Sequence, residues 1–171
     1  MRISAVEEYG LRCLLALARQ GQDSQLSISD IAQVEGLSVP YASKLLAILR
    51  RAGLVTAERG RGGGFTIATD PANINLYQVL TALGGPMIDP KHCSRFSGQK
   101  DQCVHTEQCS IHDVLGGLAG YVQSFLSKTT LRDLIAADNS GLLIRTGGKI
   151  EIAATALEQE LESQQRRTIL E

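Results

Sequence analysis

The stretch from Ser27 to Ala68 constrains the fold of this chain more than any other feature. A short helical pattern, Asp30–Val34, stops at Gly36 and is followed by the turn sequence GLSVP. A longer helical pattern then continues to about Ala52, and Ser38 is a suitable N-cap for it. A short helix, a glycine turn and a longer helix together form the helix-turn-helix pattern.

Two short β-rich runs come next, Leu54–Ala57 and Phe65–Ala68. The sequence ERGRGGG between them is flexible and basic, and it leads from one strand to another strand. This order predicts a β-hairpin with a glycine-rich tip, which is a wing. Residues 1–70 are therefore predicted to form a winged helix-turn-helix domain.

The rest of the chain is predicted to be helical around a cysteine-rich loop. A long helix over Ile111–Ser127 begins with a capping-box-like pair, Ser110 and Asp113. Its apolar stripe requires a partner surface, and we expect it to pair two subunits through Leu115, Leu118, Val122 and Phe125. Shorter patterns predict helices at Ser4–Gln20, Asn75–Leu83 and Thr130–Ala137 and a possible short strand at Leu26–Ile28.

The fold class is therefore mainly α with a small β-hairpin wing, a winged helix-turn-helix domain followed by a long dimerisation helix. We divide the chain into the DNA-binding part at 1–70, the cysteine loop and dimerisation helices at 71–138, and a tail at 139–171. The tail is either helical or disordered, because it combines two glycine breaks with a polar, Glu- and Gln-rich end.

Composition places the chain among soluble globular proteins, with 43% apolar and 20% charged residues. No apolar run approaches the roughly 20 residues that span a bilayer, and the N-terminus lacks the pattern of a signal peptide. We expect a cytoplasmic protein with no membrane partner. In that compartment thiols stay reduced, so clustered cysteines indicate a metal site rather than a disulfide.

The cysteine loop carries such a cluster: Cys93, Cys103, Cys109 and His112 are separated by nine, five and two residues. Thiolates and imidazoles suit zinc or an iron–sulfur cluster, and the spacing alone does not separate the two. Cys13 lies on the apolar face of the first helix and is interpreted as a core residue. His92 and His105 are interpreted as solvated loop residues, since no unused ligand flanks them.

The net charge of −1 excludes a broadly basic surface, so any nucleic-acid interface must be local. On the second helix of the helix-turn-helix, Ser38, Tyr41 and Lys44 are candidates for phosphate contacts and Ser43 for a base edge. The wing tip, with Arg59, Gly60 and Arg61, suits a narrow minor groove. The alternative is that the helix cations Lys44, Arg50 and Arg51 form only a solvated face.

Five stretches together resemble a known family. They are MRISAVEEYGLRCLLALA, LSVPYASKLLAILRRAGLV, ERGRGGGFTI, CVHTEQCSIH and TTLRDLI, within roughly residues 1–138. The chain resembles the IscR–NsrR–RirA–CymR family of bacterial winged-helix transcription regulators, and its loop resembles the cluster-binding branch, IscR most of all. The interval of nine residues after Cys93 is longer than the five of the IscR-like pattern.

The resemblance implies a homodimeric regulator that binds a pseudo-palindromic site on double-stranded DNA and senses an iron–sulfur cluster. It favours a cluster over zinc, and [2Fe–2S] over [4Fe–4S], on Cys93, Cys103 and Cys109. Two alternatives remain open: a zinc-stapled regulator without cluster sensing, and a cluster-carrying redox protein. No nucleophile–base arrangement or nucleotide-binding glycine motif accompanies the cysteines, so we expect neither an enzyme nor a small-molecule substrate.

The fourth ligand has two candidates. His112 follows Cys109 at helical spacing and matches the IscR-like pattern. Some relatives instead use an acidic side chain of the first helix from the partner chain, and Glu8 stands at the matching position in AVEEYG. The alternative interpretation of Glu8 is an ion pair with Arg12, four residues further along the same helix.

Overall fold

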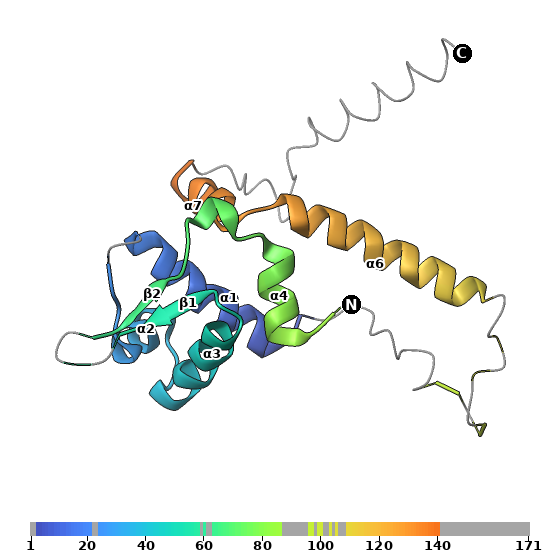
Figure 1. Cartoon of the computed structure of the whole chain (residues 1–171), viewed down its shortest axis with the longest axis horizontal. Coiled ribbons are helices and arrows are strands. Elements are labelled where there is room, and N and C mark those ends of the chain that lie inside the picture. The colour runs from blue at the N-terminus through green and yellow to red at the C-terminus, as the bar shows by residue number, and fades with distance from the viewer. Residues whose placement is uncertain are drawn as a thin grey trace, which may run out of the picture. The chain divides into compact units, whose positions relative to one another are not determined.

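The computed structural model describes residues 3–21, 24–58, 60, 63–86, 96–97, 99–100, 103, 105 and 109–140, with 138–140 as backbone only. Its elements are α1 (Ala5–Gln20), α2 (Ile28–Glu35), α3 (Val39–Arg51), β1 (Val55–Ala57), β2 (Phe65–Ile67), the 3-10 helix η1 (Pro71–Asn73), α4 (Leu76–Gly84), α6 (Ser110–Lys128) and α7 (Leu131–Ser140) (Figure 1). The predicted fold class, mainly α with a β-hairpin, is confirmed. None of the helices among these residues is long and apolar enough to cross a membrane.

The first helices begin at reciprocal capping boxes. Ser4 accepts a hydrogen bond from the amide of Glu7, whose carboxylate accepts one from the amide of Ser4. Ser27 and Asp30 make the same pair at the start of α2. Because this box starts α2 at Ile28, the possible strand at Leu26–Ile28 is reduced to a single β-bridge at Leu26.

The hairpin β1–β2 is antiparallel, with Val55 opposite Ile67 and Ala57 opposite Phe65. It gains one further contact from a distant segment: Leu26 and Phe65 exchange two backbone hydrogen bonds of 3.0 and 2.8 Å. Gly64 allows this approach, because a Cβ at that position would lie 2.7 Å from the carbonyl oxygen of Leu26. The base of the wing is therefore held by the segment that precedes α2.

One apolar core unites α1 to α4 with the start of α7. Its largest fully buried side chains are Leu14, Leu17, Ile31, Leu45, Leu46, Leu49, Val55, Ile74, Val79 and Leu131. Cys13 is also fully buried there, which confirms its interpretation as a core residue. Burial raises the pKa of the Cys13 thiol to about 11, so this thiol stays protonated at neutral pH.

The chain returns to this core after α6. The amide of Leu76 donates to the carbonyl of Thr129, and the amide of Leu131 donates to the carbonyl of Ile74, each at 2.9 Å. Thr130 and Asp133 then cap α7, as predicted, although α7 ends at Ser140 rather than near Ala137. The chain divides into two compact units, residues 1–135 and 136–171, and most of the predicted tail lies outside the described residues.

Candidate functional site

The helix α3 has an apolar face in the core and a polar face toward solvent. Leu45, Leu46 and Leu49 are fully buried, and the helix packs against α1 and α2. On the opposite side Ser38, Ser43 and Lys44 are exposed and Tyr41 is half-buried. The side chains predicted for DNA contact therefore surround the N-terminal end of α3, the end that a helix-turn-helix protein inserts into the major groove.

Ser38 occupies the N-cap position of α3, but its side chain makes no capping hydrogen bond. The predicted N-cap position is therefore confirmed, whereas the hydroxyl of Ser38 does not cap an amide of α3. The amides of Tyr41 and Ala42 instead donate to the backbone carbonyl of Ser38, each at 3.0 Å. Its hydroxyl, which both donates and accepts, is not occupied by a capping bond and suits a polar ligand.

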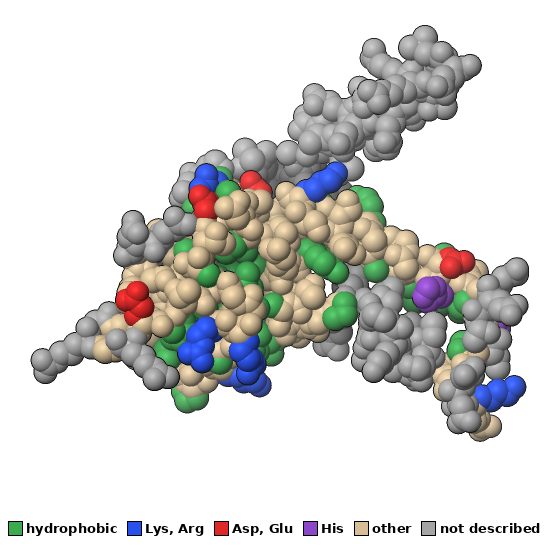
Figure 2. Space-filling view, viewed as in Figure 1, with side chains coloured by type: hydrophobic (Ala, Val, Ile, Leu, Met, Phe, Trp, Pro, Cys, Tyr) green, Lys and Arg blue, Asp and Glu red, His purple; other side chains and the backbone are tan. Residues whose placement is uncertain are grey.

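Basic side chains gather over α3 (Figure 2). Lys44, Arg50 and Arg51 are all exposed, and the helix contains no acidic residue. This helix therefore carries a local excess of positive charge, although the net charge of the whole chain is −1. Such a face attracts a polyanion, although exposed cations alone do not identify the ligand.

The sequence of the wing tip contains two further basic residues, Arg59 and Arg61. Gly60 has a φ of 120°, a conformation that favours glycine. Arg59 and Arg61 lie outside the described residues, so their predicted role in DNA binding stays a prediction. At the base of the wing, the side-chain amide of Gln25 donates to the carboxylate of Glu58 at 2.5 Å.

A polar and aromatic cluster, which the sequence did not indicate, joins the three helices of the domain. Arg12 on α1 forms an ion pair of 2.8 Å with Glu35, the last residue of α2. The Arg12 guanidinium also lies 5.2 Å from the ring centroid of Tyr9, whose ring meets Tyr41 of α3 edge to face. In the described part of the chain, the ion pair of Arg12 is with Glu35, so the alternative pairing with Glu8 is wrong.

The sequence holds one signal for this pair, a carboxylate at helical spacing from the apolar residues of α2. Ile31, Ala32 and Glu35 lie on one side of α2 and are all buried. An acid at a buried position requires a cation, and Arg12 lies next to the buried Cys13 on α1. The helical spacing was readable from the sequence, whereas the choice of Arg12 as partner depends on how the helices pack.

Cys109 begins α6. Its backbone is extended, with φ −125° and ψ 95°, and its sulfur accepts a hydrogen bond of 3.4 Å from the amide of His112. The predicted start at a Ser110 box is therefore wrong, because Ser110 is already the first helical residue. Cysteine binds metals through its sulfur, so the side chain that caps α6 is also a candidate ligand.

The other ligand candidates are only partly described. Cys103 and Cys109 are half-buried free thiols, and His105 and His112 are exposed. Cys93 and His92 lie outside the described residues. Among the residues that are described, no group of three His, Cys, Asp or Glu side chains could hold a metal ion, so the four-ligand site stays a prediction.

The apolar side chains of the long helix α6 form one broad stripe, which is half-buried along one edge and exposed along the other. Leu115 and Val122 are half-buried, and the helix contacts α4. Leu118 and Phe125 are exposed, and they share their face with three further exposed side chains, Ile111, Val114 and Tyr121. The exposed face is long and apolar, which is unusual for a surface without a partner.

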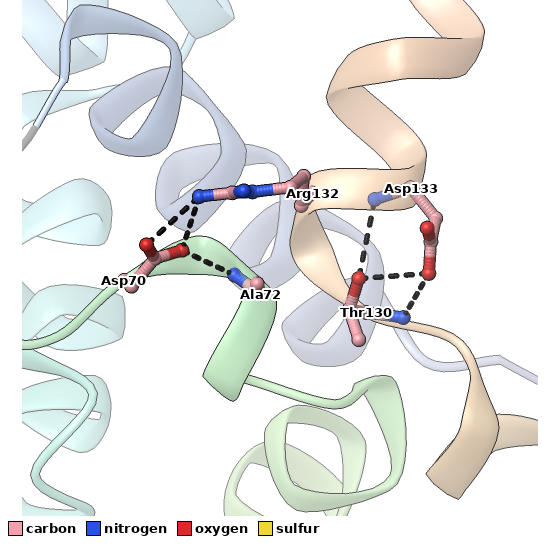
Figure 3. Close-up of polar contacts among 5 residues, drawn as sticks. All are labelled: Asp70, Ala72, Thr130, Arg132 and Asp133. Carbon is pink, nitrogen blue, oxygen red and sulfur yellow. Dashed lines mark hydrogen bonds and ion pairs between the residues drawn. The ribbon is translucent and has the colours of Figure 1, made fainter.

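A polar contact joins the first turn of α7 to Asp70, the N-cap of η1 (Figure 3). Arg132 donates to both carboxylate oxygens of Asp70, at 2.7 and 2.8 Å, and Asp70 also accepts from the amide of Ala72. Asp70 lies three residues after β2, so the segment that follows α6 is attached close to the wing.

The architecture and sequence match known transcription regulators. The family model Rrf2, described as iron-dependent transcriptional regulator, matches residues 3–137. A candidate helix-turn-helix regulator of Neisseria meningitidis serogroup A is 32% identical over 141 residues, covering 82% of this chain and 92% of that protein. IscR of Yersinia enterocolitica is 30% identical over 135 residues and covers 79% of each chain.

A solved structure of a transcription regulator has a similar fold. CymR, the global cysteine regulator of B. subtilis, has a TM-score of 0.64 and 29% identity, covering 80% of this chain and 97% of that one. These relatives regulate transcription, which confirms the expectation that the chain is not an enzyme. With a family match over 3–137 and a shared winged-helix architecture, the chain belongs to the Rrf2 family of DNA-binding transcriptional regulators.

Proposed function

We propose that this regulator binds a pseudo-palindromic DNA site as a homodimer, each copy placing the N-terminal end of α3 in a major groove. The observation that supports this most is the polar and basic face of α3, where Ser38, Ser43 and Lys44 are exposed and no acid is present. Arg59, Gly60 and Arg61 would enter the adjacent minor groove from the wing tip.

The test is DNA affinity as a function of salt. Lys44→Ala and Arg59→Ala should each weaken binding, and for a phosphate contact the salt slope should fall by about one. If Arg59 enters the minor groove, its loss should be larger on A·T-rich sites, where that groove is narrow. Lys128→Ala removes the same charge from the end of α6 and is the control. Equal affinities for all variants on every duplex would refute the proposed interface.

The partner on the exposed face of α6 is a second copy of this chain. A regulator that reads two related half-sites requires two recognition helices, and a twofold dimer supplies them. Leu118 and Phe125 are exposed on a face that Ile111, Val114 and Tyr121 continue. Leu118→Glu should produce a monomer in sedimentation, whereas Ser124→Glu, at an exposed position on the same helix, should leave the dimer intact.

The cofactor is an iron–sulfur cluster held by Cys93, Cys103 and Cys109, with [2Fe–2S] favoured over [4Fe–4S]. The donor set fits: Cys103 and Cys109 are half-buried free thiols, and the Cys109 sulfur lies at the N-terminus of α6, next to His112. When bound, the cluster supplies a centre that can change its redox state or be lost. Replacing any of the three cysteines by alanine should abolish cofactor binding, whereas Cys13→Ala should retain it.

The same donors also suit tetrahedral zinc. The visible spectrum of protein purified without oxygen separates the two cofactors. A cluster gives coloured protein with charge-transfer bands, whereas colourless protein with stoichiometric zinc would favour the zinc-stapled regulator. The match to transcriptional regulators favours either of these over a cluster-carrying redox protein.

The fourth ligand is His112, with Glu8 of the partner copy as the alternative. His112 lies on the first turn of α6, and its backbone amide already contacts the Cys109 sulfur. Glu8 is an exposed carboxylate on α1, and the ion pair of Arg12 is with Glu35. Iron content and visible spectra of the two variants distinguish these ligands. Loss of the cluster in His112→Ala would indicate the histidine, whereas loss in Glu8→Ala with an unaltered cluster in His112→Ala would indicate a ligand from the partner.

The regulatory signal would travel from the cysteine loop through α6 to the two α3 helices. α6 begins at Cys109, contacts α4, and ends in a segment that is hydrogen-bonded to Ile74 and Leu76. A change at the N-terminus of α6 would therefore alter the angle or spacing of the recognition helices in the dimer. The test is to compare DNA affinity with and without cofactor on half-sites of different spacing.

A further inference from the structure

The two helix ends that flank the turn of the helix-turn-helix are both attached to α1 by side chains. Glu35 ends α2, and Tyr41 is the third residue of α3, so they lie on either side of the connecting turn. Arg12 contacts Glu35, and Tyr9, one turn earlier on α1, contacts Tyr41. The cluster of Tyr9, Arg12, Glu35 and Tyr41, here called the turn clamp, therefore spans the turn.

Arg12 contacts Glu35 in two ways. Its Nε donates to the Glu35 carboxylate at 2.8 Å, and an Nη donates to the Glu35 backbone carbonyl at 3.2 Å. That carbonyl belongs to the last turn of α2, where the helix supplies no partner. One guanidinium therefore satisfies both the side chain and the backbone at the C-terminal end of α2.

The Glu35 carboxylate depends on this contact. Its side chain is only 8% exposed, whereas that of Arg12 is 43% exposed. Among the residues that the structure describes, Glu35 is the only charged one that is buried. A buried carboxylate is costly without a partner, so the end of α2 is held where Arg12 can reach it.

The aromatic half of the turn clamp holds the start of α3. The Arg12 guanidinium lies 5.2 Å from the centroid of the Tyr9 ring, and the rings of Tyr9 and Tyr41 are 6.0 Å apart at 80°. Stacked cations and edge-to-face rings have preferred geometries, unlike aliphatic contacts. The contacts are therefore directional as well as attractive.

We propose that Arg12, Glu35 and Tyr9 are positioning residues for DNA recognition, which set the direction of the N-terminal end of α3 without touching DNA themselves. This inference rests on the proposed function, in which α3 reads the major groove. A recognition helix that is free to tilt still meets phosphates, but it no longer aligns its side chains with base edges. Loss of the turn clamp should therefore reduce sequence-specific binding more than non-specific binding.

The experiment begins with wild-type protein, which selects its preferred duplex from a random pool. Affinity is then measured on that duplex and on a scrambled duplex of equal composition, at one salt concentration. The main variant is Arg12→Met/Glu35→Leu, because apolar replacement of a buried ion pair commonly leaves folding intact. Thermal unfolding of each variant identifies those that fail to fold.

In the double variant we expect specific affinity to fall about tenfold, the scale of one lost base contact, while non-specific affinity stays within about twofold. Tyr9→Leu should act in the same direction. Tyr9→Phe keeps the ring and Glu35→Gln keeps an acceptor, so both should preserve the ratio of specific to non-specific affinity. Lys128→Met, which removes one positive charge from α6, is the control for the effect of a lost charge on DNA affinity.

A folded double variant with the wild-type ratio of specific to non-specific affinity would overturn the inference. An equal loss of affinity on the selected and the scrambled duplex would overturn it as well. Selection of no preferred duplex by the wild-type protein is a different result, because it would contradict the proposed function itself. Failure of the inference and failure of the proposed function therefore give different results.

Discussion

Replacing Leu131 with alanine tests whether the segment after α6 completes the core of the DNA-binding domain. Leu131 is 0% exposed and belongs to the same core as Leu45 of α3. Its backbone amide is also hydrogen-bonded to Ile74, so the side chain enters the core at a fixed place. Leu131→Ala would leave this backbone contact in place and remove only the packing.

The expected cost follows from the atoms removed. Alanine lacks three carbon atoms of leucine, and at about 0.8 kcal/mol for each buried methylene the lost transfer energy is about 2.4 kcal/mol. Because the surrounding helices close the cavity only in part, the free energy of unfolding should fall by about 2–5 kcal/mol. For a chain of this length, a loss of about 3 kcal/mol lowers the unfolding temperature by roughly 6–12 °C.

Urea and thermal unfolding of the cofactor-free protein measure this change, since a bound cofactor would shift the apparent stability. Leu45→Ala, also at 0% exposure, should cost a similar amount. Val34→Ala, at 66% exposure on α2, should change stability by less than about 0.5 kcal/mol. A Leu131→Ala variant as stable as Val34→Ala would show that the segment after α6 is not part of this core.

Three further predictions concern other parts of the domain. Because burial raises the pKa of Cys13 to about 11, iodoacetamide at pH 8 should spare Cys13 in folded protein; its modification before unfolding, seen by mass spectrometry, would contradict this. Gly64→Ala should open the contact with Leu26, since a Cβ would lie 2.7 Å from a backbone oxygen, and hydrogen exchange at the wing base should accelerate. Asp70→Asn should cost less than about 1 kcal/mol, because its partner Arg132 is largely exposed; a salt-independent loss above about 2 kcal/mol would refute a surface role.

Local chemistry explains which elements were predictable. Ser4 and Glu7 form a capping box, and Gly36 adopts the left-handed conformation that ends a helix, so the start of α1 and the end of α2 follow from neighbours in sequence. The start of α2 was predicted two residues late, at Asp30 instead of Ile28. The periodicity of α3 likewise predicted that Leu45 is buried and Lys44 exposed. Each of these outcomes depends on residues within about one helical turn.

The contacts that were missed join residues far apart in the chain. Arg12 and Glu35 are 23 residues apart, and Asp70 and Arg132 are 62 apart. A sequence pattern shows that a buried acid requires a cation, but the packing of helices decides which cation is near. Spacing alone offered only a local alternative, an ion pair of Arg12 with Glu8 at helical spacing, because local pairs are the only ones that spacing predicts.

The candidate site was predicted only in part. The positions of Ser43 and Lys44 on the exposed face of α3 followed from periodicity. The cap of α6 did not, because Ser110 with Asp113 satisfied the usual pattern while Cys109 took the position. Cysteine is rarely considered as a cap, and here its sulfur accepts the amide hydrogen bond.

The burial of Leu131 also affects how the protein is made. During synthesis the chain emerges from its N-terminus, and the cysteine loop precedes Leu131. The nascent domain therefore lacks one of its fully buried side chains until the entire loop has left the ribosome. Cys93, Cys103 and Cys109 thus all leave the ribosome before Leu131 can complete the DNA-binding domain.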